Sequence, residues 1–201
     1  MKLKIFKFKK VKSTNDTAIR IIKNSNIKKG MVTSEIQLNG RGQHGNKWIS
    51  YKGNLFISFF YELKNVNMSL SALTKFNCSL VKKILEKYYK KKITLKKPND
   101  LLVDKKKISG ILQEIISKSD NKFLIVGIGI NLLKSPKIRN YPTTNLFELI
   151  NKHINRTAIE YELKVLFEKK LSKLYKVDNK LNKIWMYILG DIGNTETKIF
   201  L

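Results

Sequence analysis

Between residues 54 and 63 the chain reads NLFISFFYEL, an almost unbroken apolar run. Phenylalanine and isoleucine favour strands, and the run is far shorter than the roughly 20 apolar residues of a membrane span. A strand that offers so few polar side chains to water has to be buried. The run therefore predicts an interior strand of a sheet that other elements cover.

The rest of the chain supplies further strands and the helices to cover them. Apolar residues at 70, 73, 76, 80, 84 and 88 have the period of an amphipathic helix, which we expect over 69–91. The alternation and turn signals predict further strands at 2–8, 31–37, on both sides of 98–100, 107–116 and 122–131. Helices are expected from 13–16 to before Gly30, near 144–152 and at 157–176. Because strands and helices do not alternate strictly, we predict an α+β fold with a mixed or antiparallel sheet covered by helices.

Composition excludes several classes of protein. The chain has 201 residues and is 42% apolar, enough for one domain with a real core. Its single cysteine, Cys78, excludes an internal disulfide and a cysteine-rich zinc site, and we expect that thiol to be buried in the 69–91 helix. With neither a signal-peptide pattern nor a membrane-length apolar run, a soluble, cytoplasmic protein is expected.

The formal net charge of +26 suggests nucleic-acid binding as one alternative function. Only four of the 41 basic residues are arginine, the residue preferred for bidentate phosphate and base contacts, and the lysines are spread over every segment. We therefore do not expect specific nucleic-acid binding. A basic nucleic-acid-binding module stays as the alternative from a different class, and steep loss of binding with salt would identify it.

The stretch GRGQHGNKW, residues 40–48, places three glycines within six residues. Alone, such a cluster most often marks a turn, although it also suits a loop whose backbone approaches a ligand closely. The segment Ser13-Thr14-Asn15 could equally be a helix cap, and Pro98-Asn99-Asp100 could be a plain turn. None of these short motifs identifies a function alone.

Five motifs in order carry a resemblance to a known family: STND, QLNGRGQHGNKW, KKPND, KKISGILQE and GIGIN. Between about residues 11 and 132 the chain resembles biotin protein ligase, of the monofunctional type without an N-terminal DNA-binding domain. The resemblance implies a catalytic domain like those of class II aminoacyl-tRNA synthetases and biotinyl–lipoyl ligases, here at 1–176. It also implies that 177–201 is a truncated remnant of the family's C-terminal domain.

The implied reaction is ATP-dependent ligation of biotin, through biotinyl-5′-AMP, to a lysine of a biotin carboxyl carrier domain, with Mg²⁺ as cofactor. Joining a carboxylate to a phosphate requires cations and backbone donors, which Lys107 and Arg41 would supply, while Asp100 would lie near Mg²⁺ and ATP. The biotin-binding residues implied by the resemblance are Ser13, Thr14, Asn15, Gln37, Arg41, Gly42, Gln43 and Lys107. Those implied for ATP are Gly40, Gly45, Trp48, which would pack on adenine, Asn99 and Asn131.

Three positions depart from the family pattern. Gln43 and Asn46 stand where arginines are common, which removes positive charge from the glycine loop, residues 40–48, and Lys97 replaces a tryptophan in KKPND.

A lipoate ligase or octanoyltransferase of the same fold is the nearest rival. Those families are expected to have a run of glycines followed by a His-Asp pair at this loop, whereas the loop here reads GRGxxGxxW. A carrier domain is the expected partner, and a homodimer is compatible with the resemblance.

Overall fold

The computed structural model describes residues 2–63 and 69–176 of the chain. Within this part, no helix is long and apolar enough to cross a membrane. The prediction that 177–201 is a domain remnant lies outside the described residues.

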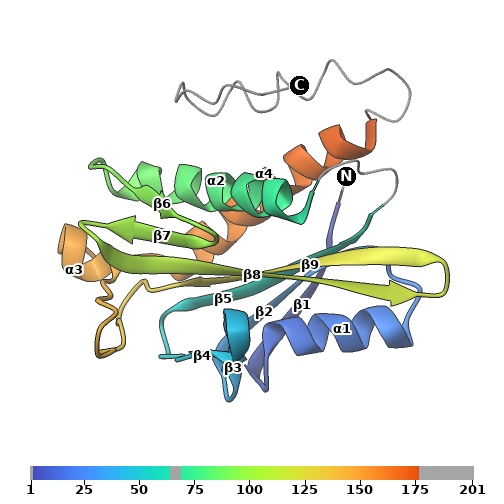
Figure 1. Ribbon diagram of the computed structural model, residues 1–201, viewed down its shortest axis with the longest axis horizontal. Helices are drawn as coiled ribbons and strands as arrows, with labels where there is room; N and C mark the ends of the chain where they lie inside the picture. Colours follow the sequence, from blue (N-terminus) through green and yellow to red (C-terminus); the bar gives the residue numbers. More distant parts are fainter. Residues whose placement is uncertain (1, 64–68, 177–201) are drawn as a thin grey trace.

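A seven-stranded sheet forms the centre of the molecule, in the order β1-β2-β5-β9-β8-β7-β6 (Figure 1). Its strands are β1 (Lys4–Val11), β2 (Lys29–Gln37), β5 (Leu55–Glu62), β6 (Thr94–Lys96), β7 (Asp100–Val103), β8 (Lys106–Lys118) and β9 (Asn121–Ile130). Only β1 and β2 pair in parallel, and every other neighbouring pair is antiparallel. The expected mixed sheet is confirmed.

Helices cover both faces of this sheet (Figure 1). On one face lies α1 (Thr14–Asn24), and on the other α2 (Leu70–Tyr88) and α4 (Arg156–Lys176) pack against each other. The short α3 (Leu146–Ile150) precedes α4 in the chain. The α+β class expected from the sequence is confirmed.

The strand β5 is buried along its whole length, as its composition predicts. Leu55, Ile57, Phe59 and Tyr61 join the larger apolar cluster, whereas Phe60 faces a smaller one that includes Ala18 and Ile22 of α1. Because successive side chains of a strand point to opposite faces, one apolar strand serves both cores. Cys78 is buried in the larger cluster, and this burial raises the pKa of its thiol to about 12.

The element boundaries follow recognisable local signals. Ser13 caps α1 by accepting a hydrogen bond from the Asp16 amide at 3.4 Å, and Ser69 caps α2 through the Ala72 amide at 3.2 Å. The glycine loop joins β2 to its antiparallel neighbour β5 and forms a small hairpin of its own, which the sequence did not predict. This hairpin consists of β3 (Gly40–Arg41), a 3₁₀ turn (Gln43–Gly45) and β4 (Lys47–Trp48).

Candidate active site

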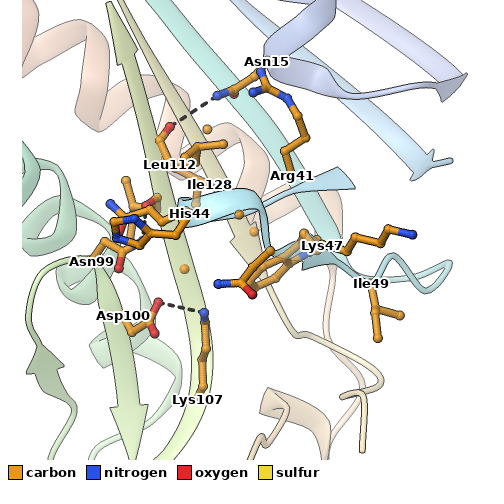
Figure 2. A pocket seen from close by; sticks show the side chains of 18 of the residues that line it. Asn15, Arg41, His44, Lys47, Ile49, Asn99, Asp100, Lys107, Leu112 and Ile128 are labelled. Carbon is orange, nitrogen blue, oxygen red and sulfur yellow. Dashed lines mark hydrogen bonds and ion pairs between the residues drawn. The ribbon is translucent and has the colours of Figure 1, made fainter. Parts of the chain in front are cut away.

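A pocket of about 690 Å³ lies between the glycine loop, the N-terminus of α1 and one end of strands β7, β8 and β9 (Figure 2). All five sequence motifs that carry the resemblance contribute residues to its wall. Its lining includes five cationic side chains, Arg41, Lys47, Lys96, Lys97 and Lys107, against one carboxylate, Asp100. A pocket with this balance of charge favours an anionic ligand.

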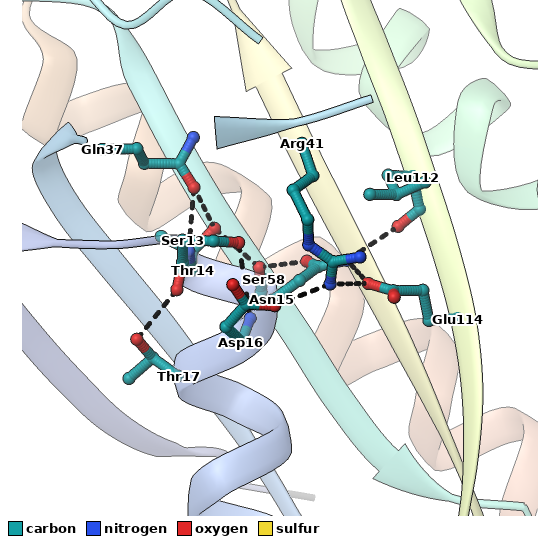
Figure 3. A network of polar contacts seen from close by, with 10 residues as sticks. All are labelled: Ser13, Thr14, Asn15, Asp16, Thr17, Gln37, Arg41, Ser58, Leu112 and Glu114. Atoms are coloured by element: carbon teal, nitrogen blue, oxygen red, sulfur yellow. Dashed lines mark hydrogen bonds and ion pairs between the residues drawn. The ribbon is translucent and has the colours of Figure 1, made fainter. Parts of the chain in front are cut away.

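One end of the pocket carries a network of amides and hydroxyls (Figure 3). Gln37 Oε1 accepts from the Thr14 amide at 2.8 Å and lies 3.0 Å from Thr14 Oγ1. Ser58 Oγ lies 2.8 Å from Thr14 Oγ1 and 2.5 Å from Asn15 Oδ1. Asn15 Nδ2 donates to Glu114 Oε2 at 2.6 Å. Such a cluster can recognise the polar head of a small molecule.

Ser13 has the helix-capping role that its spacing also allows. The capping residue orients the first turn of α1, and the next two residues, Thr14 and Asn15, reach into the pocket from that turn. The helix cap and the polar cluster are therefore the same local structure, and the two interpretations of STND are compatible.

Arg41 leaves the glycine loop toward α1 and β8. Its Nη2 lies 2.8 Å from Asp16 Oδ1 and 2.8 Å from Glu114 Oε2. Burial by itself would lower the pKa of Arg41, but the hydrogen bond and charge of Glu114, and then those of Asp16, raise it above the ordinary value. Two carboxylates thus hold the guanidinium at the amide end of the pocket.

The other end of the pocket is built around the ion pair of Lys107 and Asp100. Lys107 Nζ lies 2.8 Å from Asp100 Oδ1, while Tyr141 donates its hydroxyl hydrogen to Asp100 Oδ2 at 2.5 Å. Burial, followed by the hydrogen bond to Asp100, raises the pKa of Tyr141. Lys96 Nζ lies 4.3 Å from the centre of the Tyr141 ring. This arrangement holds the lysine and the carboxylate side by side at the pocket wall.

Metal binding at this end would depend on Asp100. Within residues 2–63 and 69–176, no three histidine, cysteine or acidic side chains gather into a metal site. Mg²⁺ fits such a place, because it is often held by one or two carboxylates, waters and the phosphates of its substrate. Asp100 could serve as that carboxylate, and the phosphates would have to supply the other ligands.

Three glycines form a flat floor between the two ends. A Cβ atom at Gly127 would overlap the Asn15 amide, and one at Gly129 would overlap the Trp48 indole. At Gly110 it would lie 2.9 Å from Trp48 and 3.0 Å from Lys107. Glycine in a strand often marks the close approach of another group. Here the bare backbone of β8 and β9 lets two pocket side chains lie directly on the sheet.

The glycine loop is closed by its own hydrogen bonds. Gly42 N donates to Asn46 O at 2.7 Å, and Asn46 N donates to Gln43 O at 3.0 Å. His44 and Gly45 have φ values of 53° and 76°, the left-handed conformation that the tight turn requires. Gly40 is needed for space, because a Cβ there would lie 2.6 Å from the Trp48 carbonyl oxygen. The cluster is thus partly a structural turn.

Most of the site residues expected from the sequence meet at this pocket. Those that line it are Ser13, Thr14, Asn15, Gln37, Arg41, Gly42, Gln43, Trp48, Asn99, Asp100 and Lys107. Three do not line it: Gly40, Gly45 and Asn131. The buried Asn131 side chain donates to the Thr144 carbonyl at 3.1 Å and thereby ties the end of β9 to the segment before α3. Its expected part in ATP binding stays a prediction.

The sequence interpretation missed several residues that shape the site. Ser58 was visible as a hydroxyl inside the apolar run of β5, and Glu114 and the three floor glycines lie within the quoted motifs KKISGILQE and GIGIN. Tyr141 had no such signal, because nothing near it in sequence indicates that it meets Asp100, 41 residues away.

The model of the family described as "Biotin/lipoate A/B protein ligase family" matches residues 7–131, and the chain belongs to that family. Two of its curated relatives are bifunctional ligase/repressors named BirA. That of Escherichia coli is 32% identical over 174 residues, which cover 79% of this chain and 54% of the relative. That of Bacillus subtilis is 28% identical over 166 residues, which cover 79% and 50%.

Among solved structures, the chain is similar to a biotin protein ligase from Aquifex aeolicus in complex with biotin and ATP. The two are 30% identical, with a TM-score of 0.71, and the match covers 94% of this chain and 76% of the other. The chain spans about half the length of the curated relatives. The fold and the family are thereby shown.

Proposed function

We propose that this protein is a biotin–[biotin carboxyl-carrier protein] ligase, which activates biotin with ATP and transfers it to a lysine of a carrier domain. The observation that supports this most is the pocket itself. It combines a polar amide cluster, a flat glycine floor under Trp48, and a lysine–aspartate pair, all contributed by motifs far apart in the chain. The similar Aquifex enzyme was solved with biotin and ATP.

The amide end suits the ureido ring of biotin, which carries both hydrogen-bond donors and an acceptor. Thr14, Asn15 and Gln37 present such groups toward the pocket. The apolar valeryl chain would then cross the pocket toward Lys107, past apolar lining residues such as Leu112 and Ile128. The biotin carboxylate would reach the cationic end, where Lys107 is already held by Asp100.

In the first step, a carboxylate oxygen of biotin attacks the α-phosphorus of ATP and pyrophosphate leaves. Two anions approach each other in this step, so a fixed cation between them lowers the barrier. Lys107 is that cation in our proposal, and Mg²⁺ would neutralise phosphate charge when bound near Asp100. In the second step, the neutral amine of a carrier lysine attacks the activated carbonyl and AMP leaves.

One assay tests this proposal. The protein is mixed with MgATP, a biotin carrier domain, and either biotin or lipoate, and mass spectrometry measures the mass added to the carrier. Biotin addition at the acceptor lysine, lost when that lysine is changed to arginine, is expected. Lipoate-dependent addition and pyrophosphate release without any from biotin would instead identify a lipoate ligase, the rival that the same family includes.

The partner and assembly are narrower proposals. A biotin carboxyl carrier domain is the partner we propose, because it carries the acceptor lysine of this reaction. A homodimer stays a prediction, which light scattering at several protein concentrations would measure. For the nucleic-acid alternative, affinity for duplex DNA should fall steeply between about 50 and 200 mM salt, whereas biotin binding should change little.

A further inference from the structure

Three oxygen-to-oxygen contacts in the amide cluster share too few hydrogens. They join Gln37 Oε1 to Thr14 Oγ1 at 3.0 Å, Thr14 Oγ1 to Ser58 Oγ at 2.8 Å, and Ser58 Oγ to Asn15 Oδ1 at 2.5 Å. Only the two hydroxyls can supply a hydrogen, one each. One of the three contacts therefore always lacks its hydrogen, and the cluster is rich in acceptors.

Rotating the Asn15 amide by half a turn would remove this shortage. Its Nδ2 would then donate to Ser58 Oγ, and every contact in the row would have a hydrogen. The amide has no other ready alternative, because it lies flat on the backbone at Gly127 and is almost fully buried. Something must hold Asn15 in the orientation that leaves the cluster short of hydrogens.

Glu114 is the group that does so. Its Oε2 lies 2.6 Å from Asn15 Nδ2, so a rotated amide would place two acceptor oxygens at that distance. The same Oε2 lies 2.8 Å from Arg41 Nη2, so the guanidinium helps to hold this oxygen in place beside Asn15. Leu112 O, 3.4 Å from Asn15 Nδ2, adds a second acceptor on that side.

We propose that Glu114 is a positioning residue that fixes the orientation of the Asn15 amide and so makes this end of the pocket a hydrogen-bond acceptor. A ligand with N–H donors would complement it, and this step rests on the proposed function, since the ureido ring of biotin has two such donors. Glu114 acts through Asn15 and does not itself line the pocket. Its contact with Arg41 also anchors the start of the glycine loop.

The proposal is tested by exchanging the amide and the carboxylate between positions 15 and 114. In Glu114→Gln the new amide can donate to Asn15 Oδ1, so the Asn15 amide should rotate and biotin should bind roughly 10- to 100-fold more weakly. Asn15→Asp sets two carboxylates face to face and should weaken binding at least as much. In the double variant, the new amide at position 114 donates to one oxygen of the new carboxylate at position 15, while the other oxygen again faces Ser58, with the total charge unchanged. Its affinity should return to within about fivefold of the original.

Asp16→Asn is the matched control, because it removes the negative charge of the other 2.8 Å partner of Arg41, while the side-chain hydrogen bonds of Asn15 go to Ser58, Leu112 and Glu114. It should change biotin affinity by no more than about threefold. Titration calorimetry with biotin measures all four variants and the unchanged protein. The proposal is wrong if the double variant binds biotin no more tightly than the single variant of lower affinity. It is also wrong if Asp16→Asn lowers biotin affinity as much as Glu114→Gln does, because Glu114 would then act only through Arg41.

Urea unfolding of the same ligand-free proteins separates this inference from the proposed function. The effects of Glu114→Gln and Asn15→Asp on the free energy of unfolding should also be non-additive, with the double variant more stable than Asn15→Asp alone. Additive midpoints would overturn the amide orientation whether or not biotin binds. Non-additive midpoints in a protein that binds no biotin would support the orientation and reject the ligase.

Discussion

Changing Lys107 to glutamine is the sharpest test of the catalytic end of the pocket. Its Nζ lies 2.8 Å from Asp100 Oδ1, where Coulomb attraction at an effective dielectric constant of about 20 is roughly 6 kcal/mol. Removing both groups from water offsets most of this, so a net value of about 1.5–3 kcal/mol is realistic for a hydrogen bond of charged groups. If Lys107 makes a bond of that strength in the transition state, its loss lowers the rate about 10- to 100-fold.

The assay is biotin-dependent release of pyrophosphate from ATP, without a carrier domain, so that only the first step is measured. Lys105→Gln is the control: Lys105 is exposed in the turn between β7 and β8, two residues away, and its loss should change the rate less than twofold. Circular dichroism confirms that both variants are folded. Equal rates for the two variants would remove Lys107 from the mechanism and refute the reasoning.

Three further predictions concern the floor and the loop. Gly127→Ala should weaken biotin binding, because the added methyl group would displace Asn15, and Gly129→Ala should weaken ATP binding, because it would displace Trp48. Calorimetry should show a loss of affinity of roughly 5- to 150-fold in each case. Loss of affinity for both ligands in each variant would contradict separate subsites. We also expect the glycine loop to become more ordered over bound ligands, so hydrogen exchange at 43–46 should slow when biotin and an ATP analogue bind. Full protection in the free protein would contradict this expectation and indicate a rigid turn. Gln43→Arg should slow dissociation of biotinyl-adenylate from the pocket about 5- to 30-fold, because a charged donor binds phosphate more strongly than a neutral amide. Less adenylate would then be released to react with exposed lysines of other proteins. Unchanged labelling of those lysines would indicate that another group holds the phosphate, and Lys47 would be tested next.

Much of the fold was predictable because its signals are local. The apolar run of β5, the helical period of α2 and the serines before α1 and α2 each act within a few residues. The small hairpin in the glycine loop was not predictable in this way, because strands of two residues leave no period to detect. The five ordered motifs predicted the family, which the match over 7–131 confirms.

The order of strands in the sheet required the tertiary structure. β9 lies between β5 and β8, although α2 and three other strands separate it from β5 in the chain. Local propensity contains no information on such distant neighbours, which are selected by burial of both faces of β5 and β9.

The sequence by itself indicated most of the residues that gather at the pocket, since its motifs lie at the ends of the elements that meet there, although Gly40, Gly45 and Asn131 do not line it and Tyr141 was missed. Only the tertiary structure decided what those residues do to one another. Arg41 is held by Glu114, 73 residues away, and Asp100 by Tyr141, 41 residues away, while Asn131 turns from the pocket toward Thr144. The physical reason is that hydrogen bonds and ion pairs depend on distances of about 3 Å, which strand register and helix packing set across segments remote in the chain.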